Sequence, residues 1–278
     1  MTTAAGDPVP AIPESAAEGE TAAIFADIRA TFGVSVVNLV WRHLATFPGA
    51  LPWCWAAVRP AYRDGSVAFQ AAALRRALPL PALPVPPAVV LDAVGIGPDA
   101  RGDIRRVLDS YDQTNAMALV ALTALALRLD GRVPAAESGG RAPIPVIDGP
   151  LPRLLARSEM TPDAATLVAR LDALGRRPDE RIVASMYRHL AHWPAYLGLS
   201  LVQLAPLAAD GRLAAAIEAA GALGREAARR IAADLTPPET PLDAATRAAA
   251  RRGIEEFTRH PIARMVPIAS LLRRLMPA

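Results

Sequence analysis

Two stretches of the sequence each place an arginine directly before a histidine. Arg42 and His43 lie in WRHLATFPGALP, and Arg188 and His189 lie in YRHLAHWPAYLG. A histidine whose pKa is close to the working pH can accept a proton from water as a general base. An arginine can bind a carboxylate through two parallel hydrogen bonds. These four residues are therefore candidates for binding a small acid and for activating water.

Each of these residue types also has a structural interpretation. Because the histidines recur in two similar stretches, they could instead form hydrogen bonds at an interface between two halves of the chain. The arginines could form ion pairs on a helix surface while their stems cover apolar side chains. The sequence leaves both interpretations open.

Asp112 is a further candidate base. It lies three residues before Asn115, which is about one helical turn, so the two side chains share a helix face. A carboxylate in a helix of mixed composition can equally face solvent or cap a helix end. Asn38 has two interpretations of the same kind, because it lies one turn before Arg42 and either faces a cavity or caps the helix start.

A metal site is poorly supported. His189 and His192 are three residues apart and could place two ligands on one helix face. The neighbouring Tyr187, Trp193 and Tyr196 are more typical of a protein core. We expect no metal and no cofactor.

The two similar stretches belong to a longer internal repeat. Trp41 and Tyr187 are 146 positions apart, and the same offset separates the dipeptides at 64–65 and 210–211, both Asp-Gly. It also relates Tyr111 to Phe257. An offset that holds over so many positions indicates a duplication.

The pattern of apolar residues predicts helices in both copies. Residues 103–127 and 245–272 have apolar residues three to four positions apart, whereas strand-like alternation is scarce. We predict an all-α fold of two tandem helical repeats, packed as a pseudo-twofold unit with a site at the seam. The predicted segments are a flexible tail (1–20), repeat 1 (21–131), a Pro- and Gly-rich linker (132–157) and repeat 2 (158–278).

Composition narrows the class of protein. The chain has 278 residues, 52% of them hydrophobic, which is enough to build a large core. Its net charge of +3 comes from scattered arginines, so nucleic-acid binding is weakly supported. Cys54 is the only cysteine, and the first residues lack the pattern of a signal peptide. We expect a cytoplasmic protein with no membrane span.

Three segments together resemble a known family. ATFPGALPWCW (45–55), IRRVLDSYDQTN (104–115) and SMYRHLAHWPAYL (185–197) are similar, in this order, to the group I 2-haloacid dehalogenases, which are all-helical and non-stereospecific. The resemblance extends from about residue 25 onward. It implies a pseudo-dimeric enzyme with its site between the repeats. There an aspartate activates a water molecule, which displaces halide from the α-carbon of a small carboxylic acid without a covalent ester intermediate.

The resemblance also implies roles for individual positions. The water-activating aspartate of the family follows a serine, and here Ser185 is followed by Met186, whose thioether cannot take the proton. Asn115 matches a polar residue that holds the water or the substrate, and Phe257 stands where the family has a tyrosine. Two pocket aromatics fall at Val36 and Leu39, which implies a cavity of different shape.

Three classes of function remain open from the sequence. The first is a hydrolytic dehalogenase with a relocated base, for which Asp112, His43 and His189 are the candidates. The second is a homologue that has lost catalysis and binds a small carboxylate, with Arg42 or Arg188 pointing into the cavity. The third is a structural or interaction protein without a cavity. We expect a small carboxylic acid as the partner, and a homodimer is compatible with the sequence.

Overall fold

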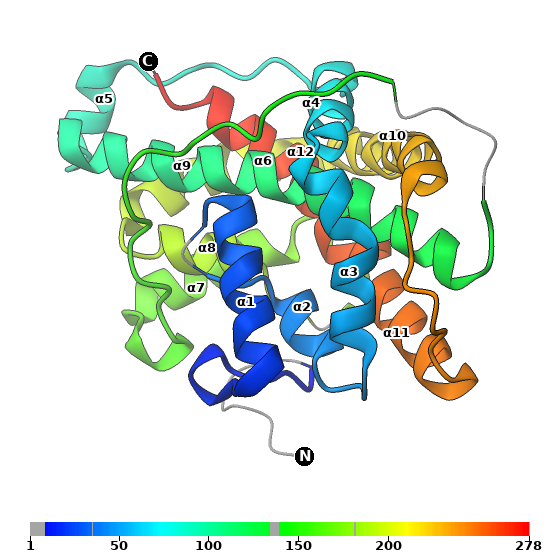
Figure 1. Ribbon diagram of the computed structural model, residues 1–278. Coiled ribbons are helices and arrows are strands. Elements are labelled where there is room, and N and C mark those ends of the chain that lie inside the picture. The colour runs from blue at the N-terminus through cyan, green and yellow to red at the C-terminus, as the bar shows by residue number, and fades with distance from the viewer. Residues whose placement is uncertain (1–8, 35, 134–138, 181, 278) are drawn as a thin grey trace.

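The protein is built from helices. The computed structural model describes residues 9–34, 36–133, 139–180 and 182–277 (Figure 1). No strand occurs within these described ranges, which confirms the predicted all-α fold. Ala, Leu and Arg, which dominate the sequence, are strong helix formers and explain this local preference.

The helices follow one another in a similar order in the two halves. Those of the first half are α1 (Gly19–Phe32), α2 (Leu39–Leu44), α3 (Ala50–Arg63), α4 (Ser66–Ala77), α5 (Ala88–Ala93) and α6 (Pro98–Leu129). Those of the second half are α7 (Pro162–Ala173), α8 (Ser185–Leu190), α9 (Pro194–Ala209), α10 (Arg212–Asp234), α11 (Ala244–Phe257) and α12 (Ala263–Arg274). The short elements are η1 (Glu14–Ala16), η2 (Arg157–Glu159) and the π-helical η3 (Thr258–Ile262), which joins α11 to α12.

Several helix bounds in the two halves are 146 positions apart. α2 and α8 share this offset at both ends, α3 and α9 share it at their last residues, and α4 and α10 share it at their first. The Asp-Gly turns before α4 and α10 have the same conformation, because Gly65 and Gly211 have φ angles of 82° and 84°. A residue with a side chain would be strained there.

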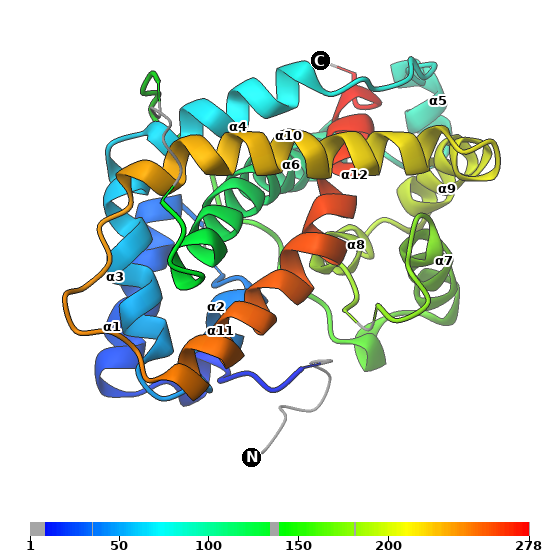
Figure 2. The same cartoon turned by 90° about the vertical axis from the view of Figure 1, so that its right-hand side faces the viewer.

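The long helix α6 passes through both parts of the core. Its C-terminal part packs with α1 to α4, α10 and α11 in one hydrophobic cluster. Its N-terminal part packs with α7 to α9 and most of α12 in a second cluster. In the view of Figure 2, α4 and α10 lie above α6 and α12 crosses beside it. Each cluster therefore contains helices from both halves of the chain.

The segment between the halves lies against the body. In Figure 1, residues 139–157 run from the α4 side across the front of the molecule to the α7 side. The amide of Ala142 donates to the carbonyl oxygen of Gly65 at 3.1 Å, and Nε of Arg188 donates to that of Leu155 at 2.8 Å. Residues 134–138 of the predicted linker lie outside the described residues. We call residues 139–157 the strap.

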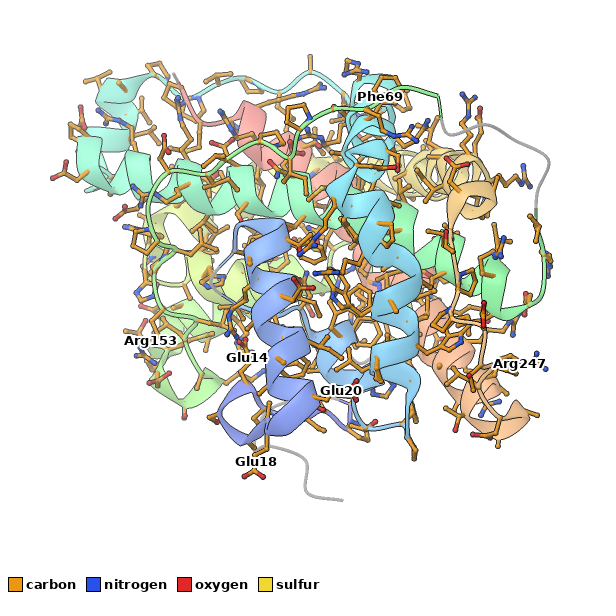
Figure 3. All side chains as sticks on the ribbon, in the orientation of Figure 1. Glu14, Glu18, Glu20, Phe69, Arg153 and Arg247 are labelled. Atoms are coloured by element: carbon orange, nitrogen blue, oxygen red, sulfur yellow. The ribbon has the colours of Figure 1, made fainter. Side chains whose placement is uncertain are left out.

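The N-terminal segment differs in part from the flexible tail predicted for residues 1–20. Residues 1–8 lie outside the described residues. From residue 9 onward the chain is packed, because Val9 is buried and the carboxylate of Glu14 accepts the amide of Val37 at 2.7 Å and a hydrogen bond from Arg29. Figure 3 shows Glu14 beside α1. These polar contacts join residues 15 to 23 positions apart, so they could not be predicted from local sequence.

Among the described residues, no helix is both long and apolar enough to cross a membrane.

Candidate ligand-binding site

A polar stretch interrupts the buried face of α6 where the two hydrophobic clusters meet. Apolar residues are buried before it, up to Leu108, and after it, from Ala116. Between them the side chains of Ser110, Thr114 and Asn115 are buried although they are polar. Buried polar groups need hydrogen-bonding partners, so such a stretch indicates a cavity or a polar contact inside the core.

A cavity of about 120 Å³ lies at this stretch. Its walls come from the starts of α2 and α8, the middle of α6, and the region from the end of α11 to the start of α12. Leu151 and Leu154 of the strap cover it, and Val36, which is 37% exposed, marks where it reaches the surface. The cavity thus lies between the two halves of the chain.

Most of the residues that the sequence singled out line this one cavity. They are Val36, Asn38, Leu39, Arg42, Asn115, Ser185, Met186, His189 and Phe257. Because they come from separate parts of the chain, only the fold brings them together. That they bind a ligand stays a prediction.

Asn115 presents an unpaired amide to the site. Its side chain is 8% exposed, and its Nδ2 is buried without a hydrogen-bond partner. A buried donor without a partner costs free energy. The cost is recovered when a ligand atom or a water molecule accepts from it, so Asn115 is suited to hold a polar ligand.

His189 is held through one ring nitrogen and unpaired at the other. Its Nδ1 lies 2.7 Å from the hydroxyl of Tyr111, whereas Nε2 is buried without a partner. Burial, followed by the charges of Arg188 and His192, lowers the pKa of His189 to about 4. The imidazole is therefore neutral at pH 7 and can accept a proton.

Tyr111 connects His189 to the first turn of α8. Burial raises the pKa of the Tyr111 hydroxyl far above its usual range, while Arg188 and a hydrogen bond with Ser185 act in the opposite direction. The hydroxyl therefore stays protonated and can donate. Ser185, Tyr111 and His189 form a short polar chain along one wall of the cavity.

Met186 occupies the position that the family resemblance assigns to an aspartate. It is 0% exposed and lines the cavity. Its thioether is at most a weak hydrogen-bond acceptor and takes no proton at neutral pH. None of the described residues that line the cavity is an aspartate or a glutamate.

Asp112 lies outside the cavity, contrary to its proposed place beside Asn115. Its carboxylate accepts a hydrogen bond from Arg75 at 2.6 Å and another from the hydroxyl of Ser270. Because Asp112 lies three residues before Asn115 on α6, its side chain points in a different direction and contacts α4 and α12 instead of α8. The structure therefore favours the structural interpretation of Asp112.

His43 and Arg188 also do not line the cavity. Nδ1 of His43 donates to the carbonyl oxygen of Pro10 at 2.7 Å, and its ring packs on Phe47 and Phe257. Arg188 binds the strap through Leu155. Both residues thus have structural contacts of the kind that the sequence left as an alternative.

Arg42 and Asn38 approach the cavity from α2. Arg42 is half-buried and lines the cavity. Asn38 is the residue before the first turn of α2, but its side chain makes no capping hydrogen bond. Its amide is therefore not committed to the helix start.

Sequence reasoning missed the importance of Tyr111 and of the strap. Tyr111 appeared only as a member of the repeat, paired with Phe257, and that offset was the one signal that could have located it. Leu151 and Leu154 carried no signal, because they lie in a Pro- and Gly-rich segment that the sequence marks only as a connection.

No protein-family model matches the chain, and no curated protein matches it in sequence. The fold matches solved structures of D-2-haloacid dehalogenases. One is a variant in complex with D-2-CPA (TM-score 0.75, 21% identity, 97% of this chain and 96% of that chain). Another variant gives a TM-score of 0.80 at 21% identity, covering 99% of this chain and 98% of that one. A complex with L-LA gives 0.78 at 20% identity, with the same coverage. The chain therefore has the fold of these dehalogenases.

Proposed function

We propose that the cavity binds a small carboxylic acid with a short apolar substituent. The unpaired Nδ2 of Asn115 is the observation that carries this proposal. A buried donor on a residue that lines a cavity gains a partner when an acceptor enters that cavity. A carboxylate supplies two acceptor oxygens, and either can accept from this amide.

Charge and size favour the same class of ligand. Arg42 contributes a positive charge to the cavity wall, and no described lining residue carries a negative one. Apolar side chains such as Leu39, Met186 and Leu154 make up much of the remaining wall. A volume of about 120 Å³ has room for several water molecules and hence for an acid of a few heavy atoms.

We further propose that the chain is a diverged relative of the 2-haloacid dehalogenases, built from two repeats packed as a pseudo-twofold unit. The offset of 146 positions and the similar order of helices support the duplication. The likeness in fold to D-2-haloacid dehalogenases supports the relationship. Their names suggest 2-haloacids as ligands to test first.

Hydrolytic dehalogenation is a second candidate function. The neutral, unpaired Nε2 of His189 favours it, because it is a proton acceptor on a residue that lines the cavity. Met186 argues against the mechanism that the family resemblance implies, since that position offers no base. If no other residue replaces it, the protein binds its ligand without reaction.

Isothermal titration calorimetry tests the binding function. Both enantiomers of 2-chloropropionate, lactate and acetate are titrated into the wild type and into Asn115→Ala. We expect millimolar or tighter binding by the wild type and a loss of about tenfold in the variant, the usual effect of one hydrogen bond to a charged group. Gln113→Ala is the control, because this amide on the same helix binds Pro145 outside the cavity. The absence of heat with all four acids would overturn the proposal.

A further inference from the structure

We propose that His189 is the general base of a hydrolytic reaction in this cavity and that Tyr111 is the residue that positions it. This inference rests on the proposed binding of a small carboxylic acid. It assigns the proton acceptor to a residue one helical turn beyond Met186, where the family resemblance places no base.

The geometry of α8 makes this relocation possible. Met186 and His189 are three residues apart, so they project from the same face of α8. Both line the cavity and both are buried. An imidazole at position 189, one turn away, can therefore act on the same part of the cavity as a carboxylate at position 186.

The two nitrogens of His189 have different roles. Nδ1 is held by the Tyr111 hydroxyl at 2.7 Å, which fixes the plane of the ring. Nε2 is buried, lacks a partner, and belongs to a side chain that is 2% exposed. An acceptor that is fixed in orientation and shielded from bulk solvent is the arrangement that proton abstraction requires.

The tautomer follows from this role. Nε2 accepts a proton only if the ring carries its hydrogen on Nδ1, which then donates to the oxygen of Tyr111. The Tyr111 oxygen also accepts a hydrogen bond from the hydroxyl of Ser185, which stabilises the oxygen as an acceptor for this Nδ1–H. Tyr111 thus acts on the reaction through His189 and does not itself need to touch the substrate.

The reaction balances with water and a 2-halocarboxylic acid as the only reactants. The water oxygen forms a bond to the α-carbon while the carbon–halogen bond breaks, and its electron pair leaves with the halide. One water proton passes to Nε2 of His189, giving an imidazolium and a 2-hydroxy acid. The proton is later lost to solvent. Asn115 Nδ2 donates to the substrate carboxylate or to the attacking water.

The surroundings keep His189 neutral before substrate enters. Arg188 and His192 come from its own part of the chain, Tyr111 faces it from α6, and Arg42 reaches the same cavity from α2. None of the described cavity residues offers a carboxylate to stabilise an imidazolium. The incoming substrate carboxylate brings this missing negative charge, so substrate binding strengthens the base.

The other half of the chain provides an internal comparison. His43 and Phe257 stand 146 positions from His189 and Tyr111, and their rings are also in contact, with centroids 5.9 Å apart. Phe257 has no hydroxyl, and His43 binds the backbone of Pro10 instead. Of the two histidines, His189 is the one that lines the cavity.

Halide release is the experiment that tests the assignment. Purified wild type, His189→Gln, Tyr111→Phe and His43→Gln are assayed with each enantiomer of 2-chloropropionate, and calorimetry with lactate runs in parallel. For His189→Gln we expect kcat to fall at least 100-fold while lactate binding changes less than threefold. Tyr111→Phe should lower kcat about tenfold with little change in KM. His43→Gln should retain wild-type kcat within about twofold.

A measurement on the wild type tests the assignment even if a variant fails to fold. In protein labelled with ¹⁵N-histidine, we expect the Nε2 resonance of His189 to have the shift of an unprotonated nitrogen at pH 7 and to move when lactate is added. A protonated Nε2 at pH 7 overturns the assignment.

The outcomes separate this inference from the proposed function. If the wild type binds the acids but releases no halide, His189 is not a base, while the binding function stands. Halide release that persists in His189→Gln also overturns the inference. If no acid binds, the proposed function fails and the inference fails with it.

Discussion

The hydroxyl of Tyr111 lies 2.7 Å from Nδ1 of His189, and this hydrogen bond joins the two halves of the chain. Tyr111 comes from α6 in the first half, and His189 comes from α8 in the second. The residues 146 positions away, Phe257 and His43, form the reciprocal contact between the halves without a hydroxyl. The pair of Tyr111 and His189 has a hydroxyl that the pair of Phe257 and His43 lacks, and Nε2 of His189 is buried without a partner.

The burial of His189 makes the stability of the protein depend on pH. Its pKa is about 4 when folded and 6.5 in the unfolded reference. Between these values the unfolded chain binds the proton and the folded protein does not, so stability rises with pH. The contribution of His189 is complete above pH 6.5 and lost as the pH falls toward 4. A shift of this size corresponds to about 3 kcal/mol.

Urea unfolding at pH 7 and at pH 4.5 measures this effect. We expect the difference in free energy of unfolding between the two pH values to be smaller in His189→Gln than in the wild type by about 2 to 3 kcal/mol. An equal difference in both proteins would mean that His189 titrates in the same way when folded and unfolded.

Replacement of Asn115 should separate stability from ligand binding. Leucine has nearly the same shape but no donor that needs a partner, so Asn115→Leu removes an unsatisfied buried group. We expect the free energy of unfolding to rise by about 1 kcal/mol in the absence of ligand. Ligand should no longer raise the melting temperature. A loss of stability of more than about 1 kcal/mol would show instead that Asn115 already has a partner in the free protein.

The helical fold could be predicted because its signals are local and repeated. Spacing of apolar residues marks each helix, and the offset of 146 places the same turn at Gly65 and Gly211. A site at the seam was predicted from the duplication, whereas Ser185 and Met186 were assigned to it through the family resemblance. Asn115 was found through family resemblance, not through its own pattern.

The details that could not be predicted depend on the direction of side chains in three dimensions. Asp112 and Asn115 are about one turn apart on α6, and other helices pack on several sides of α6. The small angle between the two side chains is therefore enough to place Asp112 against Arg75 and outside the cavity. His43 and His189 are equivalent in sequence, but Nδ1 of His43 binds Pro10 of the N-terminal segment whereas Nδ1 of His189 binds Tyr111. Contacts between distant segments leave no periodic pattern in the sequence.

A buried ion cluster supports the start of α8. Arg264, which is 1% exposed, donates to Asp172 at 3.1 Å and to Glu180 at 2.6 Å. Asp172 also accepts the amide of Ala184, the residue just before α8. Removal of the arginine leaves the buried carboxylate of Glu180 without its cation and Asp172 with Arg176 alone, which costs more than the loss of packing.

We expect Arg264→Met to lower the free energy of unfolding by about 3 to 5 kcal/mol. Arg230→Met is the matched control, because Arg230 forms an exposed pair with Glu226 on α10, and its loss should cost less than about 0.5 kcal/mol. Urea unfolding of both variants measures the difference. Similar values for the two would show that the buried cluster contributes no more than a surface pair.

A carboxylate at position 186 should supply a base where the family resemblance expects one. Met186 is fully buried and lines the cavity, so an aspartate there would be desolvated and its pKa raised. We expect Met186→Asp to cost about 3 kcal/mol of stability. In return, the double variant Met186→Asp with His189→Gln should release chloride from 2-chloropropionate at least tenfold faster than His189→Gln alone.

Met265→Asp provides the control for this gain of activity. Met265 also lines the cavity, but it projects from α12 on a different wall. A carboxylate there alters the charge of the cavity as Met186→Asp does, but it does not stand on the face of α8 that carries His189. If both aspartates restore halide release equally, negative charge alone accounts for the gain. If only Met186→Asp restores halide release, the base must stand on this face of α8 to accept the proton of the attacking water.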